Sequence, residues 1–232
     1  MNNIAEQLRL AYQNIKQNCQ QLHIINDSVQ LIAVSKTKPV ADILTAYQAG
    51  QRKFAENYPQ ELADKQQLLA EKADIEWHFI GPLQSNKTRL VAQSAAWVHS
   101  IDRLKIAKRL AEQRPESLGK LKVLIQINIS KEASKSGIAP DMMLELAEQI
   151  SALPQLELKG LMAIPKAKDD NAETGPDFLA MQHLSTQLQQ HYPDATELSM
   201  GMSNDWPIAL KNGATMIRLG TVIFGKRDKN EE

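Results

Sequence analysis

The feature of this sequence that most constrains its fold is a regular alternation of short apolar segments with amphipathic stretches. Parallel neighbouring strands cannot be joined by a tight turn, and each pair needs a crossover connection, usually a helix. A strand–helix alternation along the whole chain therefore predicts one parallel sheet with helices packed against it. The eight segments expected to be strands are rich in branched residues and span Leu31–Thr37, Arg52–Asn57, Glu76–Pro82, Trp97–Asp102, Lys122–Ser130, Leu156–Pro165, Ala195–Ser203 and Met216–Gly225.

The stretches between these segments are expected to be helices, because their apolar residues recur at helical spacing. Residues from Leu104 to Ala111, and from Met143 to Leu153, each place their apolar side chains on one helical face. The other predicted helices are Asn3–Gln21, which precedes the first strand, and Val40–Gln48, Gln60–Glu71, Gln84–Gln93, Asp177–His191 and Asp205–Asn212.

Two architectures fit this alternation, an open doubly wound sheet and a closed (β/α)8 barrel. Eight predicted strands in 232 residues favour the barrel, whose usual length is about 250 residues. Only residues 226–232 follow the last predicted strand, so we expect no eighth helix after it. The N-terminal helix should fill that place in the outer ring. No linker or repeat is evident, and we expect a single domain over residues 1–232.

Charge and composition narrow the class of protein. The chain has 27 basic and 27 acidic residues, so it lacks the positive field of a non-specific nucleic-acid or membrane binder. No apolar run approaches the roughly 18 residues that a membrane helix needs, and the charged N-terminus differs from a secretory signal. Cys19 is the only cysteine, which excludes an intrachain disulfide and a thiolate metal cluster. We expect a cytoplasmic monomer without nucleic-acid or membrane partners.

Barrels of this kind place their chemistry at the carboxyl ends of the strands, and Lys36 ends the first strand. Period-two alternation puts Lys36 on the same face as Ile32 and Val34, just above the packed interior. Burial against apolar side chains lowers the pKa of a lysine, and a free amine is the nucleophile of Schiff-base chemistry. A lysine at a strand end can equally extend its ammonium group into water without any further role. Position alone leaves both interpretations open.

The loops after the seventh and eighth strands form a second candidate site. Residues 199–205 read S-M-G-M-S-N-D and residues 218–221 read R-L-G-T. Small residues let the backbone approach a ligand closely, Ser203 or Asp205 can cap the next helix, and unpaired N–H groups at a helix start attract anions. These loops commonly bind phosphate in barrels, although an ordinary capped turn has the same composition. Together with Lys36 they suggest a phosphorylated carbonyl compound held covalently, which a class I Schiff-base aldolase would also bind.

The histidines carry less functional information. His78 alternates in phase with Ile80, so we interpret it as an interior histidine with satisfied ring nitrogens rather than as a catalytic base. The five histidines show no metal-ligand spacing. The sequence therefore predicts no metal site.

Several motifs resemble one known family over essentially the whole chain and in the same order. They are A-V-S-K-T-K-P at 33–39, F-A-E-N-Y at 54–58, W-H-F-I-G-P-L-Q-S-N-K at 77–87, I-N-I-S at 127–130, K-S-G-I at 135–138, G-L-M-A-I-P at 160–165, S-M-G-M-S-N-D at 199–205 and M-I-R-L-G-T-V-I-F-G at 216–225. The chain resembles the pyridoxal phosphate homeostasis proteins. The resemblance implies a (β/α)8 barrel like the N-terminal domain of alanine racemases, of the type III fold of pyridoxal-phosphate proteins.

The resemblance also implies a cofactor, pyridoxal 5′-phosphate (PLP), and roles for particular residues. Lys36 would hold PLP as a Schiff base, Asn57 would lie near its ring, and Arg218 would face its pyridine nitrogen. An arginine at that place weakens the electron sink that an acid would strengthen, which suits a binding protein better than a transaminase. The phosphate group would be held by Ser203, Gly220 and Thr221, with Met200 and Gly201 nearby.

Two positions depart from the family pattern. Ala55 replaces a glycine in F-A-E-N-Y, a small change at a strand end. Pro207 stands where a glutamate is usual, and proline is tolerated only in the first turn of a helix. The helix should therefore begin near Asp205 rather than at Ser203.

The function implied is PLP binding in vitamin B6 homeostasis without enzymatic turnover, with apo forms of PLP-dependent enzymes as possible recipients of the cofactor. Racemisation needs a proton donor or acceptor on each face of the substrate carbon, and Lys36 serves one face only. Two alternatives stay open, a PLP-dependent amino-acid racemase or decarboxylase and the class I aldolase.

Overall fold

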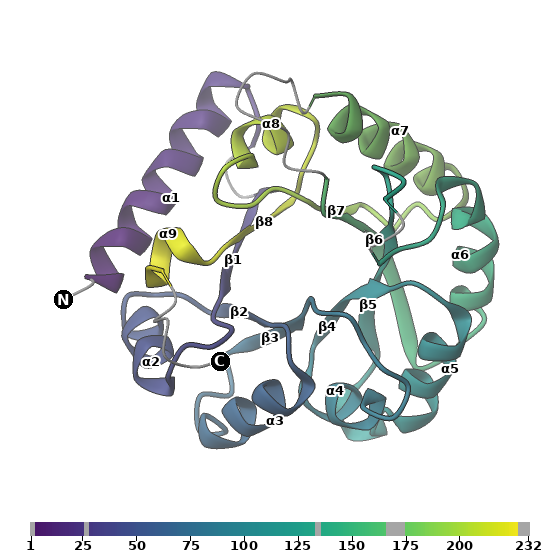
Figure 1. Ribbon diagram of the computed structural model, residues 1–232, viewed down its shortest axis with the longest axis horizontal. Helices are drawn as coiled ribbons and strands as arrows, with labels where there is room; N and C mark the ends of the chain where they lie inside the picture. Colours follow the sequence, from purple (N-terminus) through teal and green to yellow (C-terminus); the bar gives the residue numbers. More distant parts are fainter. Residues whose placement is uncertain (1–2, 26–27, 133–135, 166–174, 227–232) are drawn as a thin grey trace.

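The computed structural model describes residues 3–25, 28–132, 136–165 and 175–226, which form a closed barrel of eight parallel strands. Each strand pairs with the next one along the chain, and β8 closes the barrel against β1 (Figure 1). The prediction of a closed barrel is therefore confirmed. The strands are β1 (Gln30–Val34), β2 (Lys53–Glu56), β3 (Glu76–Phe79), β4 (Trp97–Ile101), β5 (Leu121–Ile127), β6 (Leu156–Ala163), β7 (Glu197–Ser199) and β8 (Met216–Leu219).

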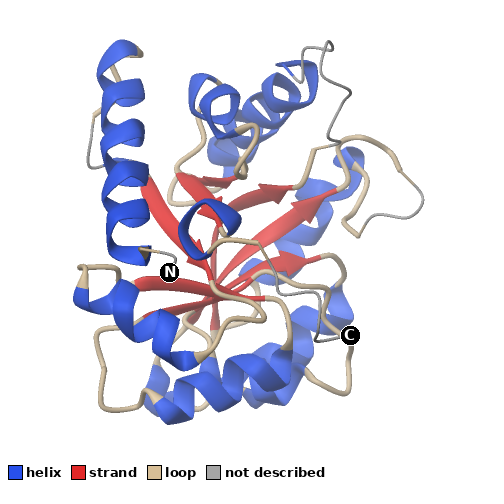
Figure 2. Cartoon of the chain, turned by 60° about the vertical axis from the view of Figure 1, so that its left-hand side comes forward, coloured by secondary structure: helices blue, strands red, loops and turns tan. Residues whose placement is uncertain are grey.

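Helices surround the barrel and cover the outer face of its strands (Figure 2). The N-terminal helix packs against α2, α8 and α9, so it closes the ring of helices as the sequence predicts (Figure 1). Asn3 precedes this helix and its side chain accepts a hydrogen bond from the Glu6 N–H. The helices are α1 (Ile4–Gln21), α2 (Val40–Gln48), α3 (Pro59–Leu68), α4 (Thr88–Ser94), α5 (Leu104–Gln113), α6 (Met143–Ser151), α7 (Gly175–His191), α8 (Trp206–Lys211) and α9 (Thr221–Phe224).

The end of the last strand differs from the prediction. The segment Met216–Gly225 is rich in branched residues, and a strand was expected throughout, with no helix after it. The structure ends β8 at Leu219, which pairs with Ala33, and Thr221–Phe224 forms the short helix α9. The reason is tertiary: β1 itself ends one residue after Ala33, so the segment beyond Leu219 has no neighbour on that side to extend the ladder.

Helix starts are predicted with mixed success. Helix α8 begins at Trp206, one residue after Asp205, as the proline at 207 requires. Asp205 does not cap it in the expected way, because its carboxylate accepts the Met202 N–H at 2.6 Å instead of one from the helix. Helix α4 begins four residues later than expected, at Thr88, because residues 85–87 form a turn.

Two apolar layers stabilise the barrel. The larger lies between the strands and the surrounding helices, and the smaller fills the barrel interior with side chains from alternate strand positions. The interior layer contains Ile32, Trp97, Leu124, Met162 and Met216, and Val34 packs against it. Ile32 and Val34 therefore share the inner face, as the alternation predicts. Within the described ranges, no helix has the length and apolarity needed to cross a membrane.

Candidate functional site

The carboxyl ends of the strands meet at one end of the barrel, which we call the mouth. Lys36 lies there, in a turn that begins two residues after β1 ends at Val34, and its side chain is half-buried. The strand pleat stops before Lys36, so the turn rather than the alternation sets the position of this side chain.

A buried ionic cluster anchors both neighbours of the candidate lysine. The Lys65 ammonium donates to the Ser35 carbonyl at 2.8 Å, to Glu56 Oε1 at 2.8 Å and to Glu61 Oε1 at 2.7 Å. The Ser35 hydroxyl donates to Glu56 at 2.6 Å, and the Thr37 N–H donates to Glu61 at 2.6 Å. Thr37 has a φ of +62°, a region that costs a β-branched residue energy and persists only where the surroundings enforce it. The cluster therefore fixes the turn between β1 and α2.

Glu56 is the least solvated member of this cluster. Its side chain is fully buried at the end of β2, and Oε2 has no hydrogen-bond partner among the described residues. Burial raises the pKa of Glu56 to about 7, although the Lys65 ammonium and the Ser35 hydroxyl act in the opposite direction. The sequence analysis missed this cluster. A charged residue inside the buried segment F-A-E-N was the one signal that could have indicated it.

The loop after β7 contributes backbone groups, rather than side chains, to the mouth. Met200 and Gly201 are buried, and Gly201 has a φ of +94°. A Cβ at Gly201 would lie 2.7 Å from the Ala209 Cβ, so the close approach of this loop to α8 requires glycine. Ser203 lies in the following turn and is half-buried.

The loop after β8 lies beside the end of β1. A Cβ on Gly220 would lie 3.3 Å from the Val34 carbonyl oxygen, which places this loop next to the start of the Lys36 turn. Thr221 begins α9 and is exposed. Among the hydrogen bonds found for the described residues, none is donated by the backbone N–H groups of Ser203, Gly220 or Thr221. The two loops thus present donors without acceptors, as an anion site needs.

Asn57 follows β2 at the mouth and contributes an unsatisfied acceptor. Its Oδ1 atom is buried and has no hydrogen-bond partner in the part of the chain that the structure describes. The side chain lines a hollow of about 250 Å³ together with Ile80, Gln126 and Ile164. Buried polar atoms without partners are rare in native proteins, so this atom is a second sign that the mouth binds a ligand.

Arg218 lies at the inner face of β8 and is almost fully buried. Its guanidinium donates to the Ser199 hydroxyl at 2.6 Å and to the Ala163 carbonyl at 3.0 Å. Burial lowers the pKa of Arg218 to about 10, while the negative charge of Asp205 opposes this effect. The side chain is therefore still a cation and a donor at neutral pH.

The interior histidines are fully hydrogen-bonded. His78 is buried, with Nδ1 2.9 Å from His99 Nε2 and Nε2 3.2 Å from a Glu76 carboxylate oxygen. The interpretation of His78 as a satisfied interior residue is confirmed. In the described part of the chain, no group of three or more histidine, cysteine, aspartate or glutamate side chains could hold a metal ion.

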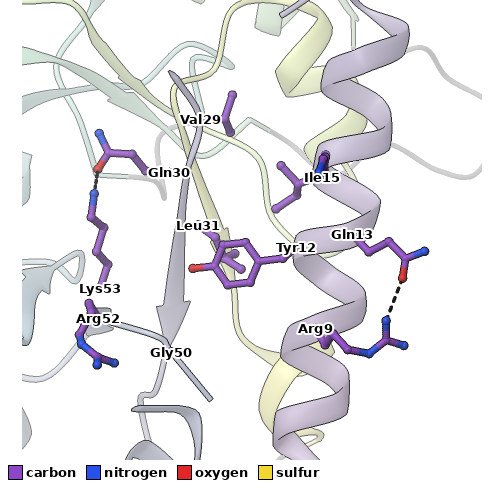
Figure 3. Close-up of a pocket in the computed structure, with 11 residues that line it drawn as sticks. Arg9, Tyr12, Gln13, Ile15, Val29, Gln30, Leu31, Gly50, Arg52 and Lys53 are labelled. Carbon is purple, nitrogen blue, oxygen red and sulfur yellow. Dashed lines mark hydrogen bonds between the residues drawn. The ribbon is translucent and has the colours of Figure 1, made fainter. Parts of the chain in front are cut away.

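A larger hollow, of about 880 Å³, lies away from the mouth. It is bounded by α1, by the start of β1 and by the residues that lead into β2 (Figure 3). Its cations Arg9 and Arg52 already pair with Glu6 and Asp74. Size alone would favour this hollow, but two of its cations are already paired, whereas the mouth lies at the strand ends where barrels place their chemistry.

One family model and several proteins of known family match this chain over most of its length. A family model for the N-terminal domain of alanine racemase matches residues 10–228. The pyridoxal phosphate homeostasis protein of Pasteurella multocida is 55% identical over 228 residues, which cover 97% of this chain and 98% of that protein. The protein of the same name from Escherichia coli K12 is 47% identical over 234 residues and the full length of both chains.

This chain belongs to the family of pyridoxal phosphate homeostasis proteins.

Solved structures agree with this assignment. PipY of Synechococcus elongatus PCC7942, in a structure with PLP bound, has a TM-score of 0.79, is 41% identical and covers 91% of this chain and all of its own. Alanine racemase from Corynebacterium glutamicum has a TM-score of 0.71 at 16% identity, with 99% of this chain and 62% of that one covered. At that identity the racemase supports the fold alone.

The residues at the mouth fit the chemistry of PLP. PLP combines an aldehyde, which an amine can attack, with a phosphate dianion and a pyridine nitrogen that accepts hydrogen bonds. The unpaired N–H groups of the loops after β7 and β8 suit the phosphate group. The Arg218 guanidinium is a donor that suits the pyridine nitrogen, and the half-buried Lys36 is an amine at the same end of the barrel.

Proposed function

We propose that this protein binds PLP covalently at the mouth of the barrel, with Lys36 holding the cofactor as a Schiff base. The observation that carries this proposal is the juxtaposition of the anchored Lys36 turn with the Gly220 loop, which meet at Val34. The structure of PipY with PLP bound, at 41% identity, supports the same cofactor for this chain.

The phosphate group of PLP is proposed to accept hydrogen bonds from the backbone N–H groups of Ser203, Gly220 and Thr221. Backbone donors keep their positions without the entropy cost of ordering long side chains. Met200 and Gly201 set the path of this loop, because both residues are buried and there is no space for a side chain at Gly201.

Arg218 and Asn57 are proposed to orient the ring. Bound PLP supplies an electron sink for amino-acid chemistry, and its strength depends on a protonated ring nitrogen. Arg218 is a donor that stays charged at neutral pH, so it holds that nitrogen unprotonated. Asn57 follows β2, which only β1 separates from β8 in the barrel, and its Oδ1 is available for a ring substituent.

The proposed role is PLP homeostasis in the cytoplasm by a monomeric protein, without enzymatic turnover. The family name supports homeostasis, and the weak electron sink beside Arg218 supports the absence of turnover. The proposed recipients of the cofactor are apo forms of PLP-dependent enzymes.

The test is a titration of the purified protein with PLP, followed by its visible absorption. We expect a Schiff-base band in the wild-type protein and its loss in Lys36→Ala, which retains the fold because a turn residue at the mouth contributes little to the apolar layers. The matched control is Lys38→Ala, two residues away, where the ammonium donates to the Lys226 carbonyl. A band that persists in Lys36→Ala, or disappears in both variants, contradicts the assignment of Lys36.

A further inference from the structure

A continuous chain of hydrogen bonds connects the two ends of the barrel interior. The Arg218 guanidinium lies 2.6 Å from Ser199 Oγ, which lies 2.9 Å from His99 Nδ1. His99 Nε2 lies 2.9 Å from His78 Nδ1, and His78 Nε2 lies 3.2 Å from Glu76 Oε1. Four strands that are distant in sequence, β3, β4, β7 and β8, contribute to this chain.

When both rings are neutral, the two ends of the chain allow one arrangement of protons. An ionised carboxylate only accepts, so His78 Nε2 must carry the proton that is donated to Glu76. A neutral His78 then accepts at Nδ1, and His99 must donate from Nε2 and accept at Nδ1. Ser199 donates its single proton to His99 and accepts from Arg218, which can only donate. Every bond therefore points from the arginine to the glutamate, and both imidazoles are neutral Nε2–H tautomers.

Burial enforces this arrangement. Ser199, His78 and His99 have no exposed surface, and Arg218 is 3% exposed, so water cannot supply alternative partners. Burial also lowers the pKa of both histidines, which agrees with neutral rings. The stacking of His78 on Trp97, with centroids 5.6 Å apart and planes 8° apart, fixes the plane of that ring.

The glutamate end of the chain lies at the opposite end of the barrel from the mouth, which we call the lower face. Glu76 lines a hollow of about 350 Å³ there, and its side chain is 27% exposed. The ammonium groups of Lys53 and Lys122 lie 3.9 and 3.7 Å from its carboxylate, and Lys53 also donates to Gln30 (Figure 3). Burial raises the pKa of Glu76, but hydrogen bonding to His78 and the neighbouring lysine charge outweigh it and lower this pKa below its ordinary value.

We infer that Glu76, His78 and His99 are positioning residues for Arg218, which fix its direction at the mouth through Ser199 from the lower face of the barrel. None of the three touches the proposed cofactor site. The orientation of Arg218 and the proton arrangement follow from the hydrogen bonds together with the burial that keeps both rings neutral. The consequence for the pyridine nitrogen rests on the proposed function.

The first test uses the cofactor-free protein and measures the ¹⁵N chemical shifts of the histidine rings. We expect His78 and His99 to be neutral Nε2–H tautomers from pH 6 to pH 8. The charged groups that face the two rings over this range are Glu76 from β3, Lys53 from β2, Lys122 from β5 and Arg218 from β8. A Nδ1–H tautomer or a charged ring at either position in the wild-type protein overturns the inference, whether or not any variant folds.

The second measurement compares Glu76→Gln with Glu157→Gln. An amide can donate as well as accept, so Glu76→Gln removes the fixed direction, and we expect the Nδ1–H tautomers to become populated. Glu157 lines the same hollow but pairs with Lys159 at 2.7 Å, so its variant should keep the wild-type tautomers. Unchanged histidine shifts in Glu76→Gln contradict the inference.

The third measurement uses protein loaded with PLP and follows the visible band with pH. We expect the midpoint of its pH profile to shift by about half a unit in Glu76→Gln and to stay unchanged in Glu157→Gln. If the wild-type protein binds no PLP, the proposed function fails while the tautomer results still decide the inference. If PLP binds and Glu76→Gln leaves the profile unchanged, Glu76 does not position Arg218 for the cofactor.

Discussion

The two ends of the barrel interior differ in how their polar groups are satisfied. At the lower face the charged side chains pair with one another, Glu76 with Lys53 and Lys122, and Glu157 with Lys159, while Trp97 Nε1 has no hydrogen-bond partner among the described residues. At the mouth, Asn57 Oδ1 and the backbone N–H groups of Ser203, Gly220 and Thr221 have no hydrogen-bond partner within the described ranges. Both ends are built from the same strands.

This difference supports the proposal that the ligand binds at the mouth. A polar group without a partner costs about 1–3 kcal/mol when it is buried, and Asn57 Oδ1 is such a group at the mouth. The ion pairs at the lower face satisfy each other's charges and contribute to stability. At the mouth, the unpaired donors and the unpaired acceptor can bind the polar groups of a ligand. In barrels of this kind, residues at the carboxyl ends of the strands carry the chemistry, and residues at the opposite end contribute to stability.

The largest expected effect concerns turnover. A positioned general base contributes about 10²–10⁴ in rate, and among the described residues at the mouth the one tyrosine, Tyr58, is 52% exposed at the start of α3. We expect PLP-loaded protein to racemise or decarboxylate amino acids at least about a hundredfold more slowly than the roughly 10 s⁻¹ of an ordinary enzyme. Chiral analysis of each L- and D-amino acid after incubation measures this rate. A rate near 10 s⁻¹ that Lys36→Ala abolishes would favour a racemase or decarboxylase.

The next effect tests the unpaired N–H groups at the mouth. Pyridoxal lacks the phosphate group of PLP, and each charge-assisted hydrogen bond contributes about 1.5–3 kcal/mol, or roughly ten- to a hundredfold in affinity. We therefore expect pyridoxal to bind at least about tenfold more weakly than PLP in an absorbance titration. Equal affinities would show that the loops after β7 and β8 do not hold the phosphate.

The cluster beneath the Lys36 turn gives a pH-dependent effect. The pKa of Glu56 is raised to about 7 in the folded protein, from an ordinary value of 4.5. The folded state therefore binds the proton more tightly, and this residue's contribution to stability grows as pH falls from 8 towards 5. Relative to Glu56→Gln, the free energy of unfolding of the wild-type protein should rise by about 2 kcal/mol between pH 8 and pH 5.5. If urea denaturation gives the same pH dependence of the free energy of unfolding for the wild-type protein and Glu56→Gln, the pKa of Glu56 lies near its ordinary value.

The smallest effect belongs to the lower face. Glu157 is 41% exposed and Lys159 is 23% exposed, and surface ion pairs contribute about 0–1 kcal/mol. Glu157→Gln should change the free energy of unfolding by less than about 1 kcal/mol and leave PLP affinity unchanged. A clear loss of PLP binding in this variant would mean that the two ends of the barrel are not distinct in function.

The fold could be predicted from local pattern because each strand and helix carries its own period. The eight apolar segments, the N-terminal helix that closes the ring and the helix start after Asp205 all follow from the sequence. The end of β8 could not be predicted. The segment Thr221–Phe224 is suited to a strand, and its helical form depends on where β1 ends.

The site could be predicted only in part, for a reason of sequence distance. Lys36 and the two loops lie at strand ends, and the barrel fold is enough to bring them to one end of the molecule. The cluster that anchors the turn joins Ser35 to Glu56 and Lys65, and the interior chain joins His99 to Ser199 across 100 residues. The local hydrophobic period cannot predict such contacts between distant residues, because each contact depends on the register of several strands.

The most direct test of the proposed site is borohydride trapping. Wild-type protein loaded with PLP is reduced with sodium borohydride, digested, and analysed by mass spectrometry for the lysine that carries the pyridoxyl group. We predict that the label lies on Lys36 in the peptide that spans A-V-S-K-T-K-P, with no label on Lys38. A label found mainly on another lysine would contradict the placement of the cofactor at the mouth beside the Lys36 turn.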